Sequence, residues 1–148
     1  VGLHFGVSSD KIKWALENYQ PTNSRSQLLK KDSNSIILDA YNANPSSMQL
    51  AIENFNKIQA KHKVLMLGSM AELGVESLHE HQQIVNLIAN CSFQSVVLVG
   101  EQFAQVQHPY LQFSTAKEAA DWYQKQNFQH THFLIKGSRS MKMETILS

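Results

Sequence analysis

Two kinds of apolar pattern alternate along most of the chain. Short, nearly uninterrupted apolar runs occur at residues 36–39, 63–68, 95–100 and 132–137. Such runs are typical of strands buried on both faces of a parallel sheet. Between them, apolar residues recur every three or four positions, which predicts amphipathic helices. Helices are expected at residues 46–58, 78–91, 101–106, 115–127 and 141–147, and weaker strands at 27–30 and 110–113.

This alternation of strand and helix predicts an α/β fold. We expect a Rossmann-like, mainly parallel sheet with helices on both faces. The carboxyl ends of the strands then bring three loops to one rim, and a ligand of such a sheet binds at that rim. These loops are residues 41–44, 69–74 and 138–140.

A polar connector after Pro21 separates a short helical segment from the regular pattern. Because proline disfavours helical conformation in the residue before it, the helix is expected to end there. We therefore predict two parts. Residues 1–24 are a helical tail and linker, and residues 25–148 are the main domain. The abrupt start at Val1 suggests a piece of a longer protein.

Composition narrows the functional classes. The chain has 148 residues and a net charge of +1, so no broad basic field for nucleic acid is expected. No apolar run approaches the length of about 20 residues that spans a bilayer. Cys91 is the only cysteine, which excludes an intramolecular disulfide and a cysteine-based zinc site. His79 and His81 are two residues apart on a predicted helix, so their rings point in different directions. His130 and His132 have no acidic or cysteine partner nearby. No metal site is therefore predicted.

The sequence has no Walker phosphate loop and no GxGxxG motif. If a nucleotide binds, most of its site lies elsewhere. Two loops still carry side chains that could bind a ligand. The apolar run 36–38 ends in Asp39, and a polar loop leads to Pro45 at a helix start; an ordinary strand-to-helix turn would look the same. Arg139, between two serines after Lys136-Gly137, suits a carboxylate or phosphate, although a solvated arginine beside a helix N-cap is the alternative.

Taken together, three motifs resemble the C-terminal domain of the Mur ligases, the ATP-dependent ligases of bacterial cell-wall synthesis. They occupy residues 39–48, 67–74 and 136–144. Tyr41 and the Gly-Ser-Arg-Ser-Met-Lys-Met run are similar to those of the members that join D-alanyl-D-alanine to UDP-N-acetylmuramoyl-tripeptide.

The resemblance implies a three-domain cytoplasmic enzyme. An N-terminal domain holds the UDP-muramoyl-tripeptide, a central domain holds ATP and Mg²⁺, and this domain brings the dipeptide and closes over ATP. The tripeptide carboxylate is activated as an acyl phosphate, which the dipeptide amine attacks. The domain alone is expected to be inactive, with no catalytic residue or metal ligand of its own.

The resemblance also implies residue roles. The residues expected to face ATP are Arg25, Asp39, Asn42 and Asn44. The residues expected to face the dipeptide are Tyr41, Lys136, Ser138 and Arg139. Ala40 and Ser69 depart from the family's frequent serine and aspartate, so no site role is predicted for the second loop.

Two other functions remain open. One is a self-sufficient α/β binding or regulatory module without catalysis. The other is the same domain of a neighbouring ligase that acts on folate or another amino acid; the tyrosine motif and the Gly-Ser-Arg-Ser run argue against it.

Overall fold

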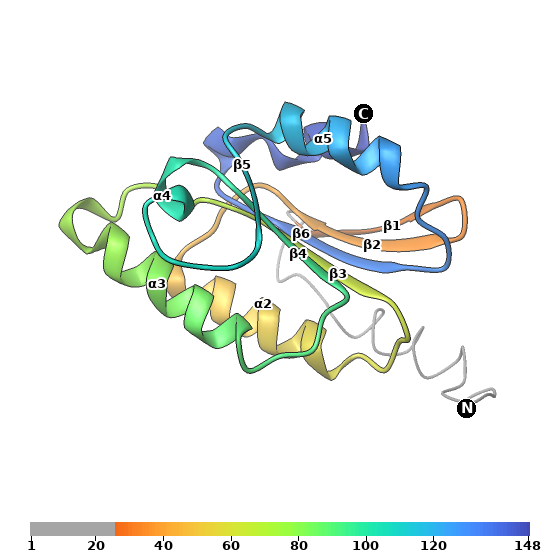
Figure 1. Cartoon of the computed structure of the whole chain (residues 1–148), viewed down its shortest axis with the longest axis horizontal. Helices are drawn as coiled ribbons and strands as arrows, with labels where there is room; N and C mark the ends of the chain where they lie inside the picture. Colours follow the sequence, from red (N-terminus) through yellow and green to blue (C-terminus); the bar gives the residue numbers. More distant parts are fainter. Residues whose placement is uncertain (1–25) are drawn as a thin grey trace.

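A computed structural model describes residues 26–148 and shows a six-stranded sheet in the order β1-β2-β6-β3-β4-β5 (Figure 1). The strands are β1 (Ser26–Lys31), β2 (Asn34–Asp39), β3 (Lys63–Gly68), β4 (Ser95–Val99), β5 (Leu111–Phe113) and β6 (His132–Lys136). Only the β1–β2 pair, at one edge, is antiparallel. The predicted mainly parallel sheet is therefore confirmed.

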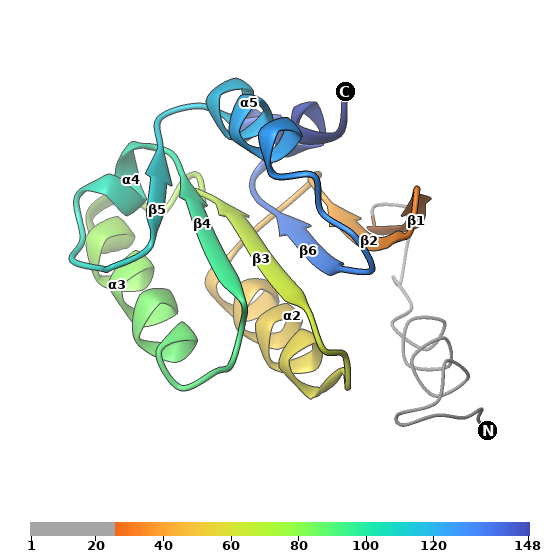
Figure 2. The same cartoon turned by 45° about the vertical axis from the view of Figure 1, so that its right-hand side comes forward.

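Helices cover both faces of the sheet, as Figures 1 and 2 show. One face is covered by α2 (Pro45–Lys57), α3 (Ser77–Ile88) and α4 (Glu101–Ala104), and the short 3-10 turn η1 (Gly74–Glu76) precedes α3. The other face is covered by α5 (Ala116–Gln126) and the 3-10 turn η3 (Met143–Leu147), which follows η2 (Arg139–Met141). Alternate residues of β6 supply both layers: Leu134 packs toward α2, whereas Phe133 and Ile135 pack toward α5.

The crossovers explain which strand ends become neighbours. From β2 the chain runs through α2 to β3 and then through α3 to β4 and on to β5, always away from β1. It then returns through α5, on the opposite face, and β6 fills the position between β2 and β3. Right-handed crossovers require the helices to change face when the direction of travel reverses. The carboxyl ends of β2, β6 and β3 thus lie side by side.

Several boundaries differ from the prediction. The predicted helix at 141–147 is two 3-10 turns, because Lys142 has a left-handed backbone with φ of 51°. The helix predicted to reach Cys91 ends at Ile88. Strand β2 begins two residues early, at Asn34, after a tight turn in which Asp32 has φ of 56°. The segment expected to be a helical tail, residues 1–24, lies outside the described residues.

Within residues 26–148, no helix is long and apolar enough to cross a membrane. The same part of the chain contains no cluster of three or more histidine, cysteine or acidic side chains that could hold a metal ion.

Candidate functional site

An ion pair joins the ends of β2 and β6. Asp39 and Lys136 are partners in the parallel register, and the Lys136 Nζ lies 2.7 Å from the Asp39 Oδ2. The Lys136 side chain is 2% exposed and that of Asp39 is 15% exposed. Because a buried ammonium is costly without a partner, this lysine needs the carboxylate. The pair leaves the carboxylate fixed in position but partly open to solvent.

The same ammonium also orders the first loop. The Lys136 Nζ donates to the backbone carbonyl of Asn42, at 3.1 Å. Asn44 is the N-cap of α2: its Oδ1 accepts from the Ser47 N–H at 2.8 Å, and the Ser47 Oγ accepts from the Asn44 N–H at 3.1 Å. Pro45 then begins the helix, where its missing N–H has no intrahelical partner to lose. One amide oxygen of the predicted ATP-facing set is therefore already engaged in capping.

A side-chain contact joins the third loop to the first. The Arg139 guanidinium lies 5.1 Å from the centre of the exposed Tyr41 ring, which is a cation–π distance. Ser138 is buried, and its Oγ is 3.1 Å from the Ser140 Oγ. Its backbone N–H donates to the Ser69 carbonyl at 3.3 Å. Arg139 thus remains on the surface while its neighbour fixes the loop to the end of β3.

Close backbone approach requires glycine where β6 ends. A Cβ on Gly137 would lie 2.7 Å from the Met143 Cγ and 3.0 Å from the Gly68 Cα. The methionine side chain could move, but the backbone of β3 is fixed by its own ladder. The turn after Lys136 can therefore follow the end of β3 this closely only because neither strand end carries a side chain there.

The first two residues of the second loop are buried and bonded to the sheet and to α3. Ser69 is buried, and both its N–H and its Oγ donate to the Val99 carbonyl, at 2.9 and 3.1 Å. The residue next to it, Met70, donates its N–H to the ring of His81. Sequence reasoning missed both Ser69 and His81. The only sequence signal for Ser69 was its position directly after a buried strand, and many loop serines share that position.

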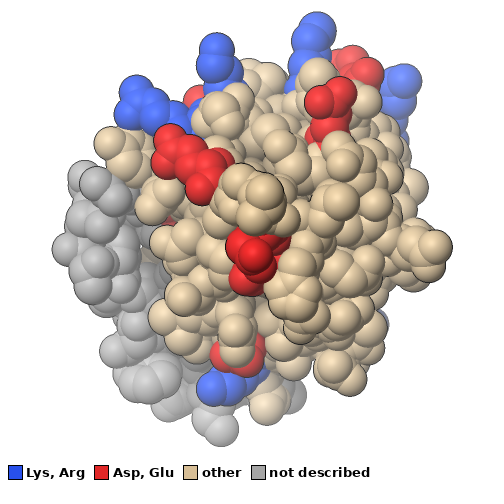
Figure 3. Space-filling model, turned by 90° about the vertical axis from the view of Figure 1, so that its left-hand side faces the viewer, with Lys and Arg blue, Asp and Glu red and all other residues tan. Residues whose placement is uncertain are grey.

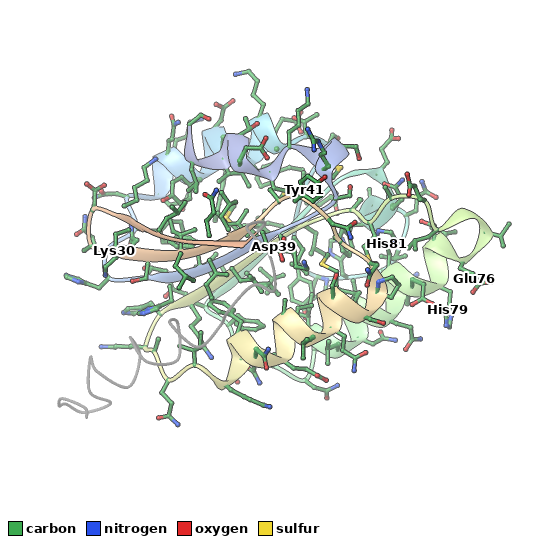
Figure 4. The ribbon with its side chains drawn as sticks, turned by 180° about the vertical axis from the view of Figure 1, so that it is seen from behind. Lys30, Asp39, Tyr41, Glu76, His79 and His81 are labelled. Carbon is green, nitrogen blue, oxygen red and sulfur yellow. The ribbon has the colours of Figure 1, made fainter. Side chains whose placement is uncertain are left out.

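Figure 4 places Asp39 and Tyr41 near each other, His81 to their right, and Glu76 of η1 and His79 of the first turn of α3 farther to the right. Figure 3 shows the left-hand side of the view in Figure 1 as a largely uncharged surface, with separate acidic groups and basic side chains mainly along its upper border. This side therefore carries separate charged groups rather than a broad patch of one charge.

The structure brings together most of the predicted site residues. Contacts join Lys136 to Asp39 and Asn42, and Arg139 to Tyr41. Ser138, next to Arg139, contacts Ser69 and Ser140, and Asn44 caps the helix that follows the first loop. Arg25 lies outside the described residues. The ligand expected at each position stays a prediction.

The family model described as "Mur ligase, glutamate ligase domain" matches residues 24–139, well over half of the chain. The chain belongs to the Mur ligase family. The resemblance of the three loop motifs is thereby confirmed, and so is the predicted fold.

Several Mur ligases with a more specific name are similar to this chain. The UDP-N-acetylmuramoyl-tripeptide–D-alanyl-D-alanine ligase of Treponema pallidum is 30% identical over 95% of the chain, and that of Buchnera aphidicola is 31% identical over 93%. The crystal structure of MurF from Acinetobacter baumannii matches 86% of the chain with a TM-score of 0.72 and 30% identity. MurF from Thermotoga maritima, solved with ADP, has the same fold at a TM-score of 0.73 and 21% identity.

The chain spans about a third of the length of these relatives: 32% of the Treponema ligase, 31% of the Buchnera ligase and 30% of each of the two crystallised chains.

Proposed function

We propose that residues 25–148 are the C-terminal domain of an ATP-dependent ligase that joins D-alanyl-D-alanine to UDP-N-acetylmuramoyl-tripeptide. Residues 1–24 are then the tail of its central ATPase domain and a linker. One observation carries the proposal: two strand ends and two loops are joined by the Asp39–Lys136 pair and the Tyr41–Arg139 contact, at the rim where such sheets bind ligands. The names of the similar ligases supply the substrates.

The reaction would proceed in the bacterial cytoplasm through an acyl phosphate. ATP phosphorylates the terminal carboxylate of the tripeptide, and the free amine of D-alanyl-D-alanine attacks that carbonyl carbon. The new amide forms as the bond to phosphate breaks, and ADP and phosphate leave. ATP and Mg²⁺ would be held mainly by the central domain, with Arg25 reaching the nucleotide phosphates from the junction.

Asp39 is proposed to bind the ribose of ATP. A carboxylate accepts hydrogen bonds from two neighbouring hydroxyls, and this one is partly exposed and held by an ammonium behind it. Lys136 is almost fully buried, so its role toward ligands is exercised through Asp39 and through the Asn42 carbonyl. Asn42 and Asn44 are exposed in the same loop, and their side-chain amides are proposed to lie toward ATP.

Arg139 is proposed to bind the carboxylate of the incoming dipeptide. Its guanidinium is exposed and is held over the Tyr41 ring, which limits its freedom before the ligand arrives. Ser138 sets the backbone that carries it, and Tyr41 supplies an apolar surface beside it. The dipeptide would thus be recognised by one fixed charge and one ring.

The test is ADP release by the longer protein, measured with and without each of the two peptide substrates. Arg139→Ala should raise the KM for D-alanyl-D-alanine about tenfold or more, because a hydrogen bond between charged groups is worth about 1.5–3 kcal/mol. Lys117→Ala removes an exposed cation of α5 and is the matched control. Equal KM values in both variants, or ADP release that does not depend on the dipeptide, would overturn the proposal.

A further inference from the structure

His81 is a completely buried histidine whose two ring nitrogens both contact the backbone. It lies in the second turn of α3 and is 0% exposed. The Nε2 accepts from the Met70 N–H at 3.0 Å, and the Nδ1 lies 2.7 Å from the Ser77 carbonyl oxygen. In the view of Figure 4, His81 lies between Asp39 and Glu76. It therefore bridges the first turn of a helix and the loop that follows β3.

The two partners determine the protonation state. A carbonyl can only accept, so the Nδ1 must carry a proton; an N–H can only donate, so the Nε2 must be free of one. Protonating the Nε2 would set two donors against each other. The neutral ring with its proton on the Nδ1 is the form that the structure requires.

The surroundings agree with this state. The Phe103 ring of α4 packs edge-on against the imidazole, with ring centres 4.7 Å apart. Burial lowers the pKa of His81, and the Ser77 carbonyl and the Glu80 carboxylate, both on α3, oppose this only in part. From the loop side the group in contact is the Met70 N–H, and from α4 it is an uncharged ring. The ring is thus neutral at pH 7.

The contact continues into the candidate site. Met70 follows Ser69, whose carbonyl accepts from the Ser138 N–H and whose hydroxyl donates to the Val99 carbonyl. We propose that neutral His81 is a positioning residue that fixes the loop after β3 and, through Ser69, the Ser138–Ser140 loop that carries Arg139. An apolar side chain would fill the same space but would leave the buried Met70 N–H without this partner. Only the catalytic consequence rests on the function proposed above.

The experiment is NMR on the chain itself, as wild type, His81→Gln and His81→Leu. At pH 7 the imidazole nitrogen shifts of the wild type should report a protonated Nδ1 and an unprotonated Nε2. On acidification the amides of Met70 and Ser138 should shift together with His81, with one midpoint below pH 6.5. Glutamine can keep an acceptor near the Nε2 position but does not titrate, so His81→Gln should keep both amides near their neutral positions and lose that midpoint.

His81→Leu removes the acceptor. Hydrogen exchange at the Met70 amide should then be about tenfold faster or more, because the amide loses its hydrogen bond. Two results would overturn the proposal. One is an unchanged exchange rate at the Met70 amide in His81→Leu. The other is a Ser138 amide in the wild type whose chemical shift does not change as His81 titrates. The wild-type titration alone decides the matter if the leucine variant fails to fold.

These amide measurements need neither nucleotide nor peptide. Their failure overturns the positioning role of His81 and leaves the proposed ligase function standing. A failed Arg139→Ala test overturns the proposed function and leaves the amide network intact.

Discussion

Two buried lysines stand at opposite ends of the same sheet. Lys63 begins β3 and Lys136 ends β6, and both are less than one-tenth exposed. The Lys63 Nζ donates to the carbonyls of Asn56 at 2.8 Å and Phe55 at 3.4 Å, in the last turn of α2. The Lys136 Nζ binds a carboxylate, that of Asp39, at 2.7 Å.

The partners, not the lysines, distinguish the two ends. At the amino end the ammonium donates to carbonyls of a helix C-terminus, which carries partial negative charge. Burial lowers the pKa of Lys63, and the electrostatic effect of Cys91 opposes this shift. At the carboxyl end the ammonium holds an acid that still reaches solvent. Under the proposed function, only the carboxyl end offers a ligand an accessible charged group.

The largest effect on stability is expected at the carboxyl end. Lys136→Met removes the partner of a mostly buried carboxylate and should lower the free energy of unfolding by about 3–5 kcal/mol. Urea denaturation of the chain measures this value. The double variant Asp39→Asn/Lys136→Met removes both charges and should recover part of the loss. A single variant as stable as the wild type would show that the pair does not fix this end.

Lys63→Met should cost less, about 2 kcal/mol. It loses the hydrogen bonds to the end of α2, but it also removes a buried charge that has no carboxylate partner within residues 26–148. Methionine still packs beside Phe55 and Phe93. The same urea series gives the comparison. A cost above that of Lys136→Met would reverse the contrast between the two ends.

His132, which begins β6 at the amino end, predicts a pH dependence. Burial and the charges of Lys30 and Lys63 lower its pKa to about 4, and within residues 26–148 its buried Nδ1 has no hydrogen-bond partner. The unfolded chain, with a histidine pKa of about 6.5, binds this proton first. Its contribution to stability is therefore complete above pH 6.5 and is lost as the pH falls toward 4.

The loss should be about 1 kcal/mol after allowing for solvent screening of a half-buried ring. The measurement is urea unfolding at pH 7 and pH 4.5 for the wild type and His132→Phe; the variant should lose less stability on acidification. His79→Gln, at an exposed position, is the control and should follow the wild type. An identical loss in wild type and His132→Phe would contradict the assignment.

The smallest effect is expected for Arg139→Ala. Its side chain is exposed and its contact with Tyr41 is at the surface, so the free energy of unfolding should change by no more than about 0.5 kcal/mol. Thermal unfolding of the chain checks this. A large loss of unfolding free energy would mean that Arg139 stabilises the fold and is not free to bind a ligand.

The sequence alone predicted the sheet in which the two lysines lie, but not the contrast between their partners. Uninterrupted apolar runs identify β3, β4 and β6 because buried parallel strands need apolar residues on both faces. The pairing of Asp39 with Lys136 could not be predicted from the residues, because it depends on β6 entering the sheet between β2 and β3. Nothing in the chain order reveals that insertion.

Local sequence patterns also failed to predict the roles of residues that depend on tertiary contacts. Ser69 and His81 look like an ordinary loop serine and an ordinary helix histidine until Val99 and Met70 are placed beside them. The last turns were predicted as one helix because their apolar spacing suits an α-helix, whereas the left-handed backbone at Lys142 divides them. Periodicity reports which side is buried, not the backbone conformation of a single residue.

The most direct test of the contrast between the two ends is ATP affinity of the longer protein, measured by calorimetry for the wild type, Asp39→Asn and Lys63→Met. The account predicts that Asp39→Asn binds ATP about tenfold or more weakly, because a hydrogen bond to a charged group is lost, while Lys63→Met binds as the wild type does. Unchanged affinity in Asp39→Asn, or an equal loss in both variants, would contradict it.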